Sequence, residues 1–171
     1  MGTGQTLLVL AALVILAIIT ISANKLVLSQ SDTVLGSEAM ITGTAIAQAK
    51  IEEATVKYFD GNVLPPLSTD TVSMFTPPPL GPSEPGVIPG DPSTYVSLSD
   101  YNGYVDTVST PRLGDFITRD SVYYVNENPP YSNVETQTFF KRIDVIVQNK
   151  YLPGPYHADT LSAIVSYRYK S

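Results

Sequence analysis

The N-terminal segment of the chain is an uninterrupted run of apolar residues. Residues 6–23 read TLLVLAALVILAIITISA and contain no charged residue, no proline and no glycine. A helix needs about 20 apolar residues to cross the hydrocarbon core of a bilayer, and this run reaches the lower end of the range that achieves it. The run therefore predicts a helix that is long enough to cross a membrane.

The helical pattern continues well beyond the apolar run. Residues 24–59 contain no proline, and their only glycines are Gly36 and Gly43. The sequence predicts one helix of about 55 residues, roughly 80 Å long, that is largely continuous over residues 6–59. Its weakest stretch is residues 29–36, where Ser, Asp, Thr and Gly have low helix propensity. We expect Gly61 to end the helix in a left-handed C-cap.

Residues 24–59 also carry two apolar stripes at helical spacing. Five residues form the first stripe: Leu35, Ala39, Ile46, Ala49 and Val56. Five residues form the second: Met40, Ala47, Ile51, Ala54 and Tyr58. We interpret one stripe as facing the rest of this chain and the other as facing a different chain. The alternative is a helix buried on two sides within one domain.

Most of the 14 prolines lie in residues 64–92. Proline fixes φ and lacks an N–H donor, so neither a helix nor a central strand is expected there. One interpretation is a disordered linker. We favour an ordered loop held by apolar anchors, which are Val72, Met74, Phe75, Val87 and Ile88.

The remaining residues have the pattern of β-strands. We expect short strands at residues 95–98 and 121–125, with a turn at Asn102-Gly103 between them. Residues 139–148 and 160–169 alternate between apolar and polar side chains, with Ile146 and Ile164 as exceptions. This alternation is typical of antiparallel strands with one buried face.

Together these segments predict an α+β fold in which a long N-terminal helix, hydrophobic and then amphipathic, packs on a small antiparallel sheet. We divide the chain into a helix that lies in a membrane or a filament core (residues 1–61), a Pro-rich surface loop (62–94) and an antiparallel β domain (95–171).

Composition narrows the possible functions. The formal net charge is −6, without the basic stripe that nucleic-acid binding requires. The chain has no cysteine and one histidine, so disulfides, cysteine nucleophiles and multi-histidine metal sites are excluded. No phosphate-binding glycine loop or G-x-S-x-G elbow is present, and His157 with Asp159 gives little support for hydrolysis. We expect no enzyme activity and no cofactor.

One weak metal site remains. Asp100, Asn102 and Asp106 place oxygen donors around a predicted turn. Their spacing does not match an EF-hand loop, which needs alternating ligands and a closing glutamate. A hairpin with solvated acidic side chains is the preferred interpretation, and a calcium site is the alternative.

The chain resembles the type IV pilin and pseudopilin superfamily. Besides the long N-terminal helix and small sheet, LSDYNGYVD (98–106) looks like an Asp-rich segment of pilin-like minor subunits. FFKRIDVIVQ and ADTLSAIVSYR look like their paired C-terminal strands. The resemblance implies insertion of the precursor in the cytoplasmic membrane, processing by a prepilin peptidase, and export by a pilus assembly machinery.

The chain departs from that family near its N-terminus. Members carry a basic leader and usually have glutamate as the fifth mature residue. No Lys or Arg precedes the apolar run here, so Met1 is a candidate mature N-terminus, with Gln5 in fifth place. Cleavage after Gly2 or Gly4 would instead place Leu7 or Val9 there. We consider two roles for Gln5: it sets the register between neighbouring helices, or it caps its own helix.

The expected function is a structural subunit of an extracellular helical filament at the cell surface, in which copies of the apolar helix pack together. The alternative is a monomeric surface protein anchored by a single membrane helix. The first interpretation places these residues in the interface between copies: Gln5, Leu8, Leu10, Leu13, Ile15, Leu16, Ile18, Ile19, Leu26, Val34, Leu35, Met40 and Ile51.

Overall fold

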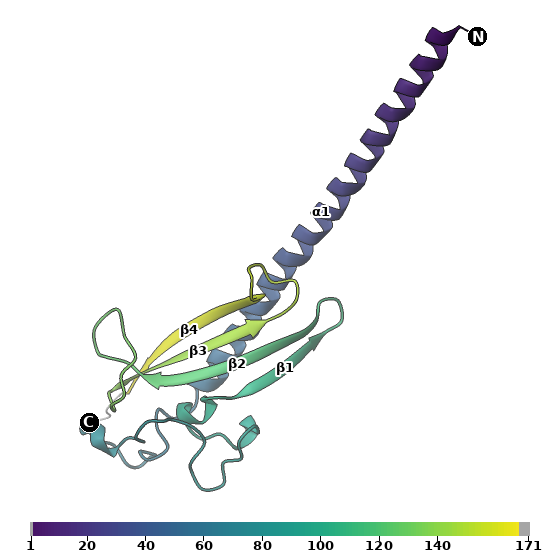
Figure 1. Ribbon diagram of the computed structural model, residues 1–171. Helices are drawn as coiled ribbons and strands as arrows, with labels where there is room; N and C mark the ends of the chain where they lie inside the picture. The colour runs from purple at the N-terminus through teal and green to yellow at the C-terminus, as the bar shows by residue number, and fades with distance from the viewer. Residues whose placement is uncertain (1, 168–171) are drawn as a thin grey trace. The chain divides into compact units, whose positions relative to one another are not determined.

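The computed structural model describes residues 2–167 and has the predicted α+β architecture (Figure 1). A long N-terminal helix packs on one four-stranded antiparallel sheet. The helix and strands are α1 (Thr3–Thr55), β1 (Val105–Thr110), β2 (Gly114–Tyr124), β3 (Phe140–Gln148) and β4 (Ala158–Ser166). Three short 3-10 helices lie between them: η1 (Val72–Met74), η2 (Pro92–Thr94) and η3 (Leu98–Tyr101).

Helix α1 is continuous over 53 residues, as predicted from the absence of proline. It ends at Thr55, however, four residues before the predicted end at residue 59. The reason is a tertiary contact: the Tyr58 N–H donates to the Val96 carbonyl at 3.1 Å, and the Leu98 N–H donates to the Tyr58 carbonyl at 2.8 Å. This pairing takes the backbone out of the helix before Gly61. Gly61 does not have the expected positive φ, so the predicted C-cap is wrong.

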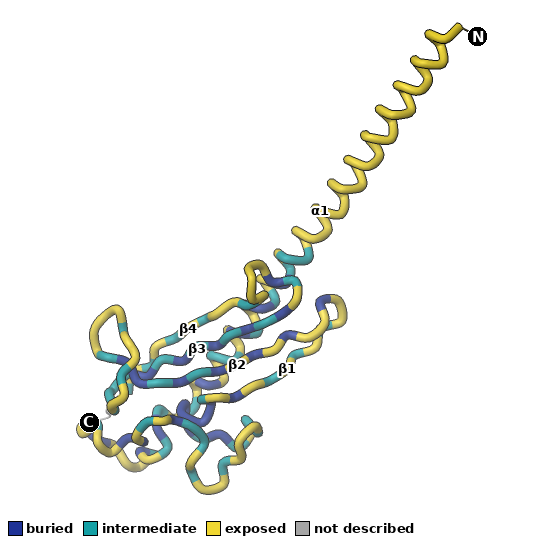
Figure 2. Tube along the Cα trace, viewed as in Figure 1, coloured by how far each residue is buried: buried dark blue, intermediate teal, exposed yellow. Residues whose placement is uncertain are grey.

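Contacts divide the chain into two compact units, and the division falls after Glu38, inside α1. We call residues 3–38 the stalk and residues 39–167 the head. Figure 2 shows that the stalk is exposed along nearly all of its length. In the head, the buried face of α1 consists of small residues: Ala39, Gly43, Ala47 and Ala54.

This buried face corrects the predicted stripes. Its residues come from both predicted stripes: Ala39 belongs to the first stripe, and Ala47 and Ala54 belong to the second. Gly43, which was in neither stripe, completes the buried face. Small side chains allow the sheet to approach the helix closely. A Cβ atom added at Gly43 would lie 3.6 Å from Val147, 3.7 Å from Phe116 and 3.8 Å from Leu152. The predicted stripes mixed large and small residues, and only their small members Ala39, Ala47 and Ala54 are buried, together with Gly43.

The sheet has the order β1-β2-β3-β4, with every neighbouring pair antiparallel. The predicted alternation in β3 is confirmed: Ile143, Val145 and Val147 are at most 1% exposed. Val145 pairs with Leu161 on β4, and Ile143 pairs with Ala163. The two strands therefore present one common apolar face, as the alternation predicted. Tyr169, part of the predicted last strand, lies outside the described residues.

The first half of the sheet was predicted less well. Residues 95–98 form no strand, because Tyr95 follows η2 and Leu98 begins η3. Strand β1 and the first half of β2 were missed. Their residues are mostly Thr, Ser and Asp, which weakens the apolar alternation. The turn at Asn102-Gly103 is present, and Gly103 has a φ of 82°.

The Pro-rich segment (62–94) forms no strand, contains η1 and η2, and packs on the head through Phe75. Phe75 is 1% exposed and anchors it among aromatic rings, with the Phe139 ring 5.6 Å and the Tyr167 ring 5.0 Å away between centroids. Two other predicted anchors, Met74 and Ile88, are exposed.

Candidate functional site

The stalk presents a large uncovered apolar surface. Its aliphatic side chains from Leu7 to Val34 are between 55% and 73% exposed. Soluble proteins rarely expose contiguous apolar patches of more than a few hundred Å² unless a lipid or protein partner covers them. By length and composition, α1 can cross a membrane. The stalk surface is therefore the candidate functional site, and we treat it as a candidate contact surface for lipid or for another protein chain.

Most of the predicted interface residues are exposed in the single chain. Three of them differ from the rest because they adjoin or belong to the head. Leu35 and Ile51 are half-buried within this chain, and Met40 is 46% exposed. The exposed members in the stalk are Gln5, Leu8, Leu10, Leu13, Ile15, Leu16, Ile18, Ile19, Leu26 and Val34.

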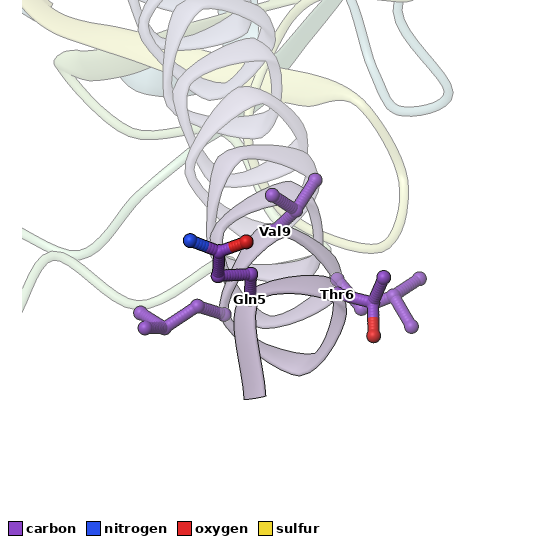
Figure 3. Close-up of a pocket in the computed structure, with 5 residues that line it drawn as sticks. Gln5, Thr6 and Val9 are labelled. Atoms are coloured by element: carbon purple, nitrogen blue, oxygen red, sulfur yellow. The ribbon is translucent and has the colours of Figure 1, made fainter. Parts of the chain in front are cut away.

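A shallow hollow lies near the start of the helix and has a volume of about 760 Å³. Five neighbouring residues on the one helix form it: Gln5, Thr6, Leu8, Val9 and Leu10. Figure 3 shows the Gln5 side chain extending away from the helix, with its amide beside Val9. Because all five residues come from one helix, the hollow has no opposite wall. It is therefore an open part of the helix surface and not an enclosed cavity.

Gln5 stands at the third residue of α1. Its backbone N–H donates to the Gly2 carbonyl at 2.9 Å, while its side-chain amide has no hydrogen-bond partner among residues 2–167. Thr6 instead binds the helix start through its hydroxyl, which donates to the Thr3 carbonyl at 2.8 Å. The described residues thus contain no capping bond from the Gln5 side chain. Its role in setting register between copies stays a prediction.

The three candidate calcium ligands are engaged in separate tasks. Asp100 Oδ2 accepts the backbone N–H groups of Val96 and Ser97 at 2.9 and 2.8 Å. Asn102 Oδ1 accepts the N–H of Val122 at 2.9 Å, and Asp106 Oδ2 lies 2.6 Å from the Lys50 ammonium. Within residues 2–167, no group of three or more acidic or histidine side chains has an arrangement that could hold a metal ion. The structure does not bring the three residues together as a metal centre.

His157 lies in the loop between β3 and β4. Its Nδ1 atom is 2.7 Å from the Leu152 carbonyl oxygen, and the residue is half-buried. This contact holds the ring against its own loop.

Sequence reasoning missed a buried ion pair in the head. Lys141, on β3, is fully buried, and its ammonium lies 2.6 Å from Asp60 Oδ2. The same ammonium donates to the Phe59 carbonyl and to Ser99 Oγ, both at 2.8 Å. Burial opposes the charge on Asp60, but Lys141 and the Thr76 hydroxyl outweigh it and hold the Asp60 pKa below its usual range. Burial lowers the pKa of Lys141, although Asp60 acts in the opposite direction.

The position of Lys141 gave a signal for this pair. It occupies a position of the strand that the alternation assigns to the buried face, where a charged side chain needs a partner. The pair ties the segment between α1 and the Pro-rich loop to the start of β3. Its role is to position these segments, and both side chains are closed off from solvent.

A second buried carboxyl group, Asp120 on β2, has no partner. It is 2% exposed, and neither of its carboxyl oxygens has a hydrogen-bond partner within the described residues. Burial raises its pKa to about 7, and Glu53 and Asp106 act in the same direction while Lys50 opposes them. Asp120 is therefore protonated in acidic solution and begins to ionise near neutral pH, so this part of the head is sensitive to pH.

A scan of protein-family models and searches of curated proteins and solved structures find no match to the chain.

Proposed function

We propose that the chain is a structural subunit of an extracellular helical filament, in which the stalks of many copies pack side by side and the heads form the outer surface. The precursor is inserted in a membrane through the stalk and is withdrawn from it on assembly. This assembly mode resembles that of type IV pilins, and by that resemblance a prepilin peptidase and a pilus assembly machinery would act on the chain.

The observation that carries the proposal is the length of the exposed apolar surface. A bilayer core is about 30 Å thick, which some 20 helical residues span. Exposed apolar side chains continue beyond Lys25 with Val27, Leu28 and Val34, and on to Ile41, which is 73% exposed. A membrane that covers residues 6–25 leaves these side chains in water. Packing against copies of the same helix covers both parts.

The free energy of covering this surface is large enough to hold assembled stalks together in water. If each stalk buries roughly 1,500 Å² of apolar surface at about 25 cal/mol per Å², the gain relative to exposure to water is about 40 kcal/mol before entropic costs are subtracted. Transfer of the stalk from lipid to other stalks exchanges one apolar environment for another and gains far less, so withdrawal from the membrane falls to the assembly machinery. Because a contact between different sides of identical helices need not close into a ring, it produces an open filament.

A monomeric surface protein with a single membrane anchor is the second candidate. It is favoured by the same apolar run, which is sufficient to cross a bilayer. This interpretation assigns no role to the apolar side chains beyond Lys25.

Val34→Lys separates the two functions. Val34 lies about 13 Å beyond Lys25 along the helix, outside a bilayer that covers the apolar run. In a filament its position is packed among other stalks, so the charge prevents assembly. In a monomeric anchor the substitution lies in water and changes nothing. Val34→Ile, which keeps an apolar side chain at the same position, is the matched control.

The measurement is electron microscopy of material sheared from cells that produce each variant. We expect filaments from the natural chain and from Val34→Ile, and none from Val34→Lys. Recovery of the natural chain only from detergent-solubilised membranes, without filaments, would contradict the proposal and support the monomeric anchor.

A further inference from the structure

The stalk carries two charges of opposite sign. Between Gly2 and Ser37 the only charged residues are Lys25 and Asp32. Both are exposed, and within residues 2–167 neither has an ion-pair or hydrogen-bond partner from another side chain. A surface otherwise composed of apolar and small polar side chains thus contains one ammonium and one carboxylate.

The two charges lie on the same side of the helix but cannot meet within one copy. Seven residues separate them, which places them about 20° apart around the helix and about 10.5 Å apart along it. A salt bridge on one helix needs a spacing of three or four residues. Ser29 lies on the same side, so Lys25, Ser29 and Asp32 form a polar stripe with heptad spacing, and Gly36 continues the same side without a side chain.

Packing of stalks makes this stripe costly unless its charges are paired. A charge that is buried without an opposite partner costs several kcal/mol, and in a filament that cost recurs in every subunit. Two stalks aligned without displacement would place Lys25 opposite Lys25 and Asp32 opposite Asp32. A displacement of one heptad places Lys25 of one stalk opposite Asp32 of the other, and the same displacement between successive stalks pairs the remaining charges.

We propose that in the filament Lys25 of one copy forms an ion pair with Asp32 of a neighbouring parallel copy, which is displaced along the helix axis by about two turns. This inference rests on the proposed filament function. In a bundle every copy turns the same side toward a common axis, so the polar stripes of successive copies converge there. Each copy offers one Lys25 and one Asp32, so the contact repeats from copy to copy without closing.

The pair would set the register of the stalks. Contacts between aliphatic side chains are not directional and permit sliding. The ion pair forms at one displacement only. At any other displacement both Lys25 and Asp32 are buried without a partner, which disfavours that displacement. In a monomeric anchor, by contrast, Lys25 would extend to the lipid headgroups and Asp32 would be solvated.

Cysteine pairs measure the displacement directly, because the natural chain has no cysteine. Ser22 and Ser29 lie on the same side of the helix and are also seven residues apart. Replacing them keeps Lys25 and Asp32 in place. Filaments of the double variant Ser22→Cys, Ser29→Cys should form disulfides between copies on mild oxidation, which should give a ladder of multimers on a non-reducing gel. The matched control is Ser22→Cys, Leu26→Cys, which keeps both charges, has about half the displacement and should remain monomeric. Filaments of the first variant that form without a ladder, or a control that crosslinks equally, would overturn the inference.

Charge exchange provides the second test. We expect Lys25→Asp and Asp32→Lys each to lower the yield of sheared filaments about tenfold or more, because each leaves like charges packed together. The double variant Lys25→Asp, Asp32→Lys should restore the yield. Single variants with the natural yield, or a double variant no better than the singles, would contradict the pair while leaving the filament intact. Absence of filaments from the natural chain would instead contradict the proposed function.

Discussion

The two parts of helix α1 bury their apolar residues in opposite ways. In the head, the helix places Ala39, Gly43 and Ala47 under the sheet, and these small side chains are covered within the chain. In the stalk, the helix carries Leu8, Ile15 and other large aliphatic side chains that nothing in residues 2–167 covers. Small side chains on α1 mark contact with this chain's own sheet, whereas large aliphatic side chains mark a surface that requires lipid or another copy.

The largest expected effect comes from a charge in the stalk. Ile15→Lys should abolish filaments, because a lysine packed among identical helices has no carboxylate to meet. The head should stay folded, since it forms a separate compact unit. Electron microscopy of sheared material and circular dichroism of the solubilised chain report the two effects. Ile15→Val, which keeps an apolar side chain, should assemble. Normal filaments from Ile15→Lys would contradict the claim that the apolar side chains of the stalk are packed among other copies.

Within the head, the largest effect should come from breaking the buried ion pair. Asp60→Ala leaves the fully buried Lys141 ammonium without its carboxylate and should lower the free energy of unfolding by about 3–5 kcal/mol. Urea denaturation of the detergent-solubilised chain, followed by tyrosine fluorescence, measures it. Asp144→Ala breaks the partly exposed pair with Arg142 and should cost about 1 kcal/mol or less. Equal losses in the two variants would contradict the structural role of the buried pair.

The pH dependence of the head should come mainly from Asp120. Its pKa is raised from the ordinary value of 3.8 to about 7, so the folded head binds a proton that the unfolded chain has released. The stabilisation is therefore complete below pH about 4 and is lost as pH rises through about 7, a total of about 4 kcal/mol.

Asp120→Asn keeps a neutral side chain of the same shape and should flatten this pH dependence. We expect the variant to match the natural chain near pH 4 and to be more stable above pH 8. The measurement is urea denaturation at each pH. A natural chain whose stability does not fall between pH 5 and pH 8 would show that Asp120 is ionised or solvated in the folded head.

A smaller effect is expected at Gly43, the centre of the buried helix face. Gly43→Ala should stabilise the head by about 0.5–1 kcal/mol, because alanine favours the helix and its Cβ would make ordinary contacts at 3.6–3.8 Å. Gly43→Leu should destabilise it, because the larger side chain has no space beneath the sheet. Thermal unfolding of the two variants gives the comparison, and a destabilising alanine would mean that the helix and sheet lie closer than described.

The elements with strong periodicity could be predicted from the sequence. The absence of proline and the long apolar run determine α1, and the alternation in β3 identified Ile143, Val145 and Val147 as its buried face. The helix end could not be predicted. Asp60-Gly61 is a strong local stop signal, but the backbone pairing of Tyr58 with Val96 and Leu98 ends the helix earlier. That pairing joins segments far apart in the sequence, which local propensity does not register.

The candidate site could be predicted in part. The exposed apolar surface follows directly from the stalk sequence. The buried face of α1 was placed wrongly because its residues were divided between two stripes and Gly43, between them, was assigned to neither. The Lys141–Asp60 pair was missed because its two residues are far apart in the chain, although a lysine on the buried face of β3 indicates that a partner exists.

The central claim is that other copies cover the stalk beyond the membrane, and labelling of a single introduced thiol tests it most directly. Val34 is 55% exposed in the isolated chain, so the thiol of Val34→Cys should react with a membrane-impermeant maleimide in detergent. Tyr156, in the head, is 83% exposed, so the thiol of Tyr156→Cys should react in every state and reports access to the head. We predict that in sheared filaments the thiol at position 34 is protected while the thiol at position 156 is labelled. Equal labelling of both positions on intact cells and in sheared material would contradict the account.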